Sequence, residues 1–201
     1  MRHRYVLYCL IMKKNNQTQI SKELKLYFLL SSGQDYSAKE LMNEADISNR
    51  RTYERYLDDI RNSGLLSIKW DRKHNNYSCG FDCIDKTLPD KKKAHLMRLI
   101  RLVNFVNQLE PTELLELIEY YDDMIENEEF LETLKERDPK AVYYRLYPAG
   151  NEKTRQRDFE EIRRAGHTIH YSKKLGVFIF IVMYLSDGLI PPDEKINTDK
   201  L

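Results

Sequence analysis

The strongest restriction on how this 201-residue chain can fold is an internal repeat. Residues 51–64, RTYERYLDDIRNSG, align with residues 153–166, KTRQRDFEEIRRAG, at an offset of 102 positions. Five of the fourteen aligned positions are identical, and most of the others are conservative. Each copy is followed by an extended segment, a polar turn with basic residues and a second extended segment. The repeat therefore predicts two similar helices, each followed by a β-hairpin.

The residues before the first copy predict two more helices. Apolar residues between Ile20 and Leu30 recur at helical spacing, and Gly33 marks the end of this first core helix. Ser37 and Glu40 form a capping-box signature, which predicts a second, short helix directly after Ser37.

A third helix and a hairpin are predicted next. Ser48 or Asn49 can cap this helix, which ends at Gly64 and has a buried stripe made of Tyr53, Leu57 and Ile60. Residues 66–79 alternate between apolar and polar around a polar turn, as a β-hairpin does. Short helices joined by a tight turn, followed by a hairpin, predict a winged helix-turn-helix.

The predicted fold class is mainly α with small β-hairpin wings, in which tandem winged helix-turn-helix domains are joined by long helices. Two more helices are predicted between the copies of the repeat, one over 92–108 and an acidic one over 114–134. The first could be the first helix of the second winged domain and the acidic helix an insertion, or the two roles could be reversed. The expected organisation is an N-terminal arm over 1–19, a first winged helix-turn-helix domain over 20–90, a helical linker or insertion over 91–138 that is acidic from 110 to 138, a second winged-helix domain over 139–190, and a flexible tail over 191–201.

Cysteine usage and the N-terminus indicate a cytoplasmic protein. The three cysteines are too few for a disulfide framework, and Cys79 and Cys83 lack the paired spacing of a zinc site. The first twelve residues, MRHRYVLYCLIM, contain an apolar run too short to span a bilayer, so we expect no membrane association. This segment either packs on the body of the protein or precedes a natural start at Met12.

Residues 47–57, ISNRRTYERYL, resemble the recognition helix of DeoR-like winged helix-turn-helix regulators, the type that commonly precedes a WYL sensor domain. The usual pattern there is a capping serine, then Arg-Thr, then Arg-Asp-Leu. Residues 151–159, NEKTRQRDF, keep the Arg-Asp pair but have Arg155 where an apolar residue is expected. We expect no WYL-type sensor in this chain.

The resemblance implies a bacterial or phage transcription regulator that binds double-stranded DNA as a homodimer, with the recognition helix at residues 48–63 in the major groove. Asn49, Arg50 and Glu54 are the base-reading candidates, because Asn and Arg can pair with adenine and guanine edges. The other DNA-binding candidates are Ser48, Arg51, Thr52 and Arg55 on the helix, Arg72, Lys73 and His74 on the wing, and Lys153, Thr154, Gln156, Arg157, Lys173 and Lys174 in the second copy.

Three alternatives stay open at this point. The arginines could simply form a solvated face paired with acids one helical turn away. The chain could be a plasmid or phage replication initiator, since those proteins also use tandem winged helices. It could also be an interaction scaffold or antirepressor in which the winged helices bind protein.

No catalytic motif is recognisable in the sequence. It lacks a Gly-rich phosphate loop, a nucleophile elbow and a paired zinc-ligand motif, so we expect no enzyme activity, no cofactor and no metal site. His167 and His170 are expected on opposite faces of a strand, where they cannot share a metal ion. The effector and the sign of regulation are not encoded in any recognisable motif.

Overall fold

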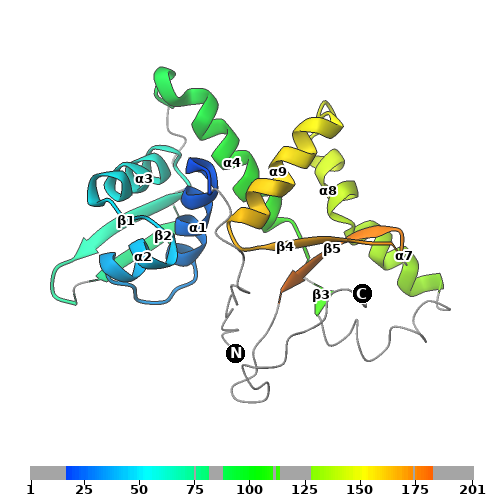
Figure 1. Cartoon of the computed structure of the whole chain (residues 1–201), viewed down its shortest axis with the longest axis horizontal. Helices are drawn as coiled ribbons and strands as arrows, with labels where there is room; N and C mark the ends of the chain where they lie inside the picture. The colour runs from blue at the N-terminus through cyan, green and yellow to red at the C-terminus, as the bar shows by residue number, and fades with distance from the viewer. Residues whose placement is uncertain are drawn as a thin grey trace, which may run out of the picture. The chain divides into compact units, whose positions relative to one another are not determined.

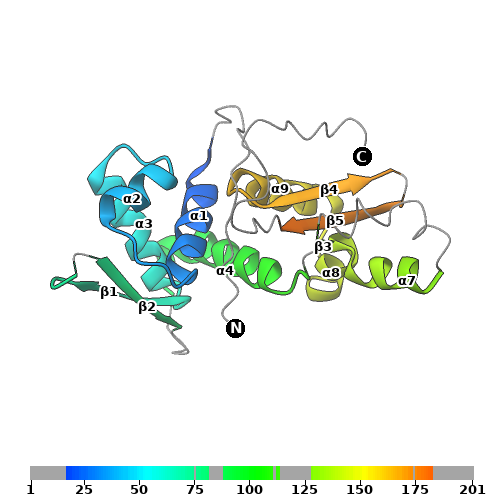
Figure 2. The ribbon, with the colours of Figure 1, turned by 90° about the horizontal axis from the view of Figure 1, so that it is seen from below.

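The computed structural model describes residues 17–74, 76–81, 88–110, 112–113, 128–173 and 175–182 (Figures 1 and 2). These residues divide into two compact units. The N-terminal unit contains the described residues up to 107 together with residues 160–165, and the C-terminal unit contains residues 108–159 and 166–182. Both units are mainly helical and carry a small antiparallel hairpin, in agreement with the prediction of a mainly α protein with small β-hairpins. The predicted arm before residue 17, the acidic helix at 114–127, Lys174 and the tail at 191–201 lie outside the described residues.

The N-terminal unit begins with the three predicted helices. Thr18 caps the first, the predicted capping box of Ser37 and Glu40 is present at the second, and Asn49 caps the third. Asp46, in the turn before the third helix, has a positive φ of 57°, a conformation that aspartate tolerates better than most residues. The helices are α1 (Gln19–Ser31), α2 (Ala38–Glu44) and α3 (Arg50–Asn62).

The predicted hairpin follows α3 as β1 (Leu66–Asp71) and β2 (Asn76–Phe81). The strands are antiparallel, with Leu66 opposite Phe81 and Asp71 opposite Asn76. α3 contacts β1 and α1 contacts β2, so the hairpin packs on the helices that precede it. The predicted stripe of α3 is buried, because Tyr53, Leu57 and Ile60 are at most 2% exposed.

The helix after the hairpin belongs to the N-terminal unit. A short 3₁₀ helix, η1 (Asp90–Lys92), leads into α4 (Lys93–Asn107), which contacts α1 and α3. Leu96, Leu99 and Leu102 are fully buried. The sequence predicted that residues 92–108 form a linker or the first helix of the second winged domain. In the structure α4 instead belongs to the N-terminal unit, because its apolar side completes the core of that unit.

The C-terminal unit places helices against a three-stranded sheet. Its sheet has the order β3-β5-β4, and β4 pairs antiparallel with β5 from Thr168 opposite Ile181 to Ser172 opposite Val177. α7 and α8 both contact β5. The elements are β3 (Thr112–Glu113), α7 (Glu128–Arg137), α8 (Pro139–Leu146), α9 (Glu152–Arg164), β4 (Thr168–Ser172) and β5 (Val177–Val182).

In the acidic region the sequence predicts a helix over 114–134, and the structure adds a short strand before this range. Thr112 and Glu113 form β3, which pairs in parallel with the end of β5. Helix is observed only from Glu128 onward among the described residues of this segment. The reason is tertiary: β5 has a free edge at Ile181 and Val182, and β3 satisfies its backbone groups there.

The two copies of the repeat show the same burial. Tyr53 and Arg155, Leu57 and Phe159, and Ile60 and Ile162 are pairs of buried side chains at the 102-residue offset. Gly64 and Gly166 both follow their helices with positive φ angles, 75° and 103°, that favour glycine. The similarity therefore extends from sequence to the pattern of buried positions and to the glycine that follows each helix.

The strand Val177–Val182 is apolar throughout, which is unusual for an exposed strand. Val177, Ile179 and Phe180 are buried against the C-terminal unit. Among the residues that the structure describes, no helix is both long enough and apolar enough to cross a membrane.

Candidate nucleic-acid interface

The outward side of α3 lines an open groove on the N-terminal unit. Seven of its lining residues come from the helix and its cap, and the eighth, Lys92, comes from η1. All of its lining residues are polar or charged, and they carry both signs of charge. Its lining residues are Asn49, Arg51, Thr52, Glu54, Arg55, Asp58, Asn62 and Lys92.

Asn49 has a structural role in addition to its predicted one. Its side-chain oxygen accepts hydrogen bonds from the backbone N–H groups of Arg51, at 2.8 Å, and Thr52, at 3.2 Å. These bonds satisfy two donors that would otherwise lack a partner at the start of α3. Ser48, the other predicted cap, is exposed and lies before the cap position.

Arg50 and Glu54, both predicted to read bases, are paired with each other. The Arg50 Nε donates to a Glu54 carboxylate oxygen at 2.8 Å, and both side chains are more than half exposed. This hydrogen bond raises the pKa of Arg50 above its already high usual value. The arginine therefore stays charged, and the pair can open at little cost because exposed pairs of this kind contribute only about 0.3–0.5 kcal/mol.

Arg51 and Arg55 differ from Arg50. Both are exposed one turn apart on α3, and within the described part of the chain neither lies in an ion pair. The Arg55 guanidinium lies 5.3 Å from the centre of the Tyr56 ring. One alternative was that acids of the same helix neutralise these two arginines. In the structure Asp58 pairs with Arg61 instead.

The tip of the β1–β2 hairpin is held by Asp71. Its carboxylate accepts from the backbone N–H of Lys73 at 2.8 Å and lies 2.6 Å from the His74 Nδ1. The hydrogen bond with Asp71 raises the pKa of His74, which favours the charged imidazolium. Arg72, Lys73 and His74 are all exposed at this tip.

The second copy presents a smaller basic surface. Lys153, Gln156 and Arg157 are exposed on α9, and Thr154 is half-buried. Asn151 caps the helix, accepting from the Thr154 N–H at 2.9 Å, while Gln156 donates to Glu152. Lys173 is exposed in the β4–β5 turn.

Arg155, which departs from the family pattern, is buried. Its guanidinium pairs with Glu152 and lies 4.7 Å from the centre of the Phe159 ring. The pairing with Arg155 lowers the pKa of Glu152 to about 2. Arg155 therefore fills the apolar position with its carbon chain and its ring contacts rather than facing a ligand.

The two histidines of the second copy differ in exposure, and His167 lies just before β4 rather than on it as predicted. His167 is buried beside Phe180, and burial lowers its pKa to about 4. His170 is exposed on β4.

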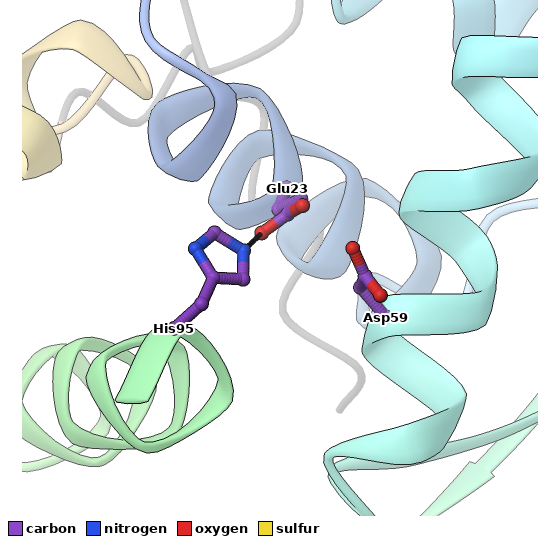
Figure 3. A group of neighbouring side chains, drawn as sticks. All are labelled: Glu23, Asp59 and His95. Carbon is purple, nitrogen blue, oxygen red and sulfur yellow. Dashed lines mark hydrogen bonds and ion pairs between the residues drawn. The ribbon is translucent and has the colours of Figure 1, made fainter. Parts of the chain in front are cut away.

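One group of polar residues was not predicted from the sequence. Glu23 of α1, Asp59 of α3 and His95 of α4 meet inside the N-terminal unit (Figure 3), and they are the only group with metal-ligating side chains in suitable proximity among the described residues. The signal available in the sequence is weak: Glu23 interrupts the apolar stripe between Ile20 and Tyr27, a position where an acid is unusual.

The comparisons with known proteins gave no match: no protein-family model, no curated protein and no solved structure resembles the chain at a significant level.

Proposed function

We propose that the N-terminal unit is a winged helix-turn-helix domain that binds double-stranded DNA through α3, and that the protein is a sequence-specific transcription regulator of the DeoR-like kind. In this proposal the first half of α3 enters the major groove and the β1–β2 hairpin lies along the phosphate backbone. A homodimer would place two such helices on half-sites about one helical turn apart, or multiples of that.

The observation that carries the proposal is the pair Arg51 and Arg55. An exposed arginine normally gains from a nearby carboxylate, and α3 contains three acids, Glu54, Asp58 and Asp59. Yet Glu54 pairs with Arg50 and Asp58 pairs with Arg61, and the guanidinium groups of Arg51 and Arg55 line the groove without an ion pair among the described residues. Two unneutralised guanidinium groups on one helical face suit the phosphates of a duplex.

Two further features support the same proposal. The order α1, α2, α3, β1, β2 is that of a winged helix-turn-helix, and the turn between α2 and α3 is short. The hairpin tip carries Arg72, Lys73 and a histidine whose charged form is favoured by Asp71. A basic tip beside a basic helix provides two contacts on one duplex.

A titration of DNA with purified full-length protein tests the proposal. Fluorescent duplexes from the promoter region of the protein's own gene are compared with random duplexes at two salt concentrations. The expected result is a preference of about a thousandfold or more for a specific site, and a steep loss of affinity with salt. The double variant Arg51→Ala and Arg55→Ala should abolish this preference.

The matched control removes two exposed charges elsewhere. Lys135 at the end of α7 and Arg145 at the end of α8 are both exposed and lie in the C-terminal unit. Lys135→Ala with Arg145→Ala should retain DNA binding. Micromolar binding to every duplex, equal in both double variants, would contradict the proposal and favour a protein-interaction scaffold; preferred binding to repeated sites at a replication origin would favour an initiator.

A further inference from the structure

The group formed by Glu23, Asp59 and His95 joins three helices at the centre of the N-terminal unit (Figure 3). Each residue offers one ligand atom, and these atoms lie within 4.8 Å of one another. Glu23 and Asp59 are fully buried, whereas the side chain of His95 is 30% exposed. The group is thus buried on the side of its two carboxylates and partly exposed at His95 on α4.

Two buried carboxylates are costly unless positive charge lies beside them. The His95 Nε2 lies 2.6 Å from one Glu23 oxygen, and the Lys92 Nζ lies 2.5 Å from one Asp59 oxygen. Lys92 is a long side chain that remains 42% exposed, so it reaches the carboxylate from the surface. A cation thus already balances Asp59, and it can leave without unfolding a helix.

The amide of Gln19 marks the focus of the group. Its Nε2 lies 2.8 Å from a Glu23 oxygen, 3.5 Å from an Asp59 oxygen and 3.3 Å from the His95 Nε2. A single position within hydrogen-bonding distance of all three residues is where a shared cation would be held. The amide of Gln19 occupies this position, and because Gln19 is exposed its side chain can swing toward solvent when the ion enters.

The ligand types and spacing suit a divalent transition-metal ion. Carboxylate and imidazole ligands bind such ions at about 2.0–2.2 Å, which places tetrahedral ligands about 3.4 Å apart. The observed spread therefore requires only small side-chain movements. Imidazole favours Zn²⁺, Fe²⁺ or Co²⁺ over Ca²⁺ and Mg²⁺, which prefer oxygen alone.

We propose that Glu23, Asp59 and His95 bind one divalent transition-metal ion, and that the ion displaces the ammonium group of Lys92 from Asp59. The ion takes over the charge that Lys92 supplied, and Lys92 keeps its own charge. The His95 Nε2 donates to Glu23, so its proton must move to Nδ1 or leave to solvent before this nitrogen binds the ion. The Asp59–Lys92 and Glu23–His95 pairs are replaced by bonds from Glu23, Asp59 and His95 to the ion.

The released Lys92 already lines the groove along α3, together with Arg51 and Arg55. Metal binding therefore transfers one positive charge from the buried Asp59 to that surface. This second step rests on the proposed DNA-binding function: with the ion bound, the protein should bind DNA more tightly, and the slope of log K against log salt should steepen by about one phosphate contact.

Metal binding is tested first, without DNA. Full-length protein is stripped with EDTA and titrated with Co²⁺, whose visible absorption reports its coordination, and then with Zn²⁺ as competitor. We expect one ion per chain, displacement of Co²⁺ by Zn²⁺, and a higher melting temperature with either ion. Mg²⁺ at the same concentration should produce none of these effects.

Three variants locate the ion. Asp59→Asn and His95→Gln should each weaken Co²⁺ binding by more than about 100-fold. Loss of a residue that only hydrogen-bonds to a metal ligand already costs about 10–100-fold in affinity, and loss of a ligand itself should cost more. The matched control is Asp58→Asn, which removes the neighbouring exposed acid of α3 and should leave Co²⁺ binding unchanged. His95→Gln retains the buried Asp59–Lys92 pair, so it keeps the test valid even if Asp59→Asn fails to fold.

Measurements of DNA affinity with and without the metal ion separate this inference from the proposed function. Lys92→Gln should bind Co²⁺ at least as tightly as the unmodified protein but should lose the gain in DNA affinity on metal addition. Absence of Co²⁺ binding in the unmodified protein overturns the metal site, whatever the DNA results. Metal binding without any DNA binding leaves the site standing and overturns the proposed function, and metal-independent DNA binding overturns only the release of Lys92.

Discussion

The guanidinium of Arg155 lies 4.7 Å from the centre of the Phe159 ring, one turn further along α9. It also lies 5.0 Å from the ring of Phe178, and the residue is only 3% exposed. Its carboxylate partner, Glu152, has a side chain that is 52% exposed. The charge of Arg155 is therefore neutralised at the surface, while its carbon chain and guanidinium plane pack in the interior.

Replacing Arg155 separates its packing role from its charge. We expect Arg155→Met to retain the stability of the protein, because an apolar side chain of similar length fills the site and Glu152 can be solvated. Arg155→Ala should lower the free energy of unfolding by about 2–3 kcal/mol through the space it leaves. Urea denaturation measures both, with the exposed Arg157→Ala as control; a methionine variant as unstable as the alanine variant would show that the charge matters more.

The caps of α3 and α9 should contribute to stability independently of any ligand. Asn49→Ala and Asn151→Ala each remove an oxygen that accepts a backbone N–H at the start of its helix. We expect each to cost about 1 kcal/mol in thermal or urea denaturation, whereas Asn→Ser at the same positions should cost only a few tenths. Equal losses for serine and alanine at Asn49 would mean that the cap contributes little.

Burial of His167 makes the stability of the C-terminal unit depend on pH. Its pKa is lowered by burial from the usual 6.5 to about 4, so between these values the unfolded chain binds a proton that the folded chain does not. The stabilisation is complete above pH 6.5 and is lost as the pH falls toward 4, by about 2 kcal/mol at pH 5.

Denaturation at pH 7.5 and pH 5 of His167→Gln, which cannot be protonated, checks this expectation. The variant should show a smaller difference between the two pH values than the unmodified protein. The exposed His170→Gln on β4 is the matched control and should keep the original pH dependence. If both variants behave alike, His167 is not the group responsible.

Arg50 and Arg51 are neighbours with different expected effects on DNA binding. Arg51→Ala should weaken binding to every duplex and reduce the slope of log K against log salt by about one, as expected for loss of a phosphate contact. Arg50→Ala should reduce the preference for the specific site by about 1–3 kcal/mol, because freeing Arg50 from Glu54 costs little. Binding isotherms at three salt concentrations distinguish the two; the opposite pattern would exchange their roles.

Local signals in the sequence predicted much of the N-terminal unit. The capping box at Ser37 and Glu40, the cap at Asn49 and the hairpin after Gly64 were all confirmed, because each depends on neighbouring residues. Burial of Tyr53, Leu57 and Ile60 also followed from the apolar spacing of the first copy, whereas burial of Arg155 did not.

Interactions between distant segments were missed. β3 is only two residues long and depends on an edge of β5 far along the chain, and α4 joined the first unit through its packing on α1. The group of Glu23, Asp59 and His95 comes from three helices, and nothing in one helix indicates the other two partners. Such features depend on tertiary packing, which periodicity within a segment does not encode.

The pairing of β3 with β5 also sets an order for folding during synthesis. β1 and β2 are joined by a short turn and can pair once residue 81 has left the ribosome, whereas Thr112 pairs with Ile181. Closing such a long loop is entropically costly, so contacts of this kind form late. While the ribosome is still producing α7, α8 and α9, β5 has not yet been synthesised, and the backbone groups of β3 are hydrogen-bonded to water instead.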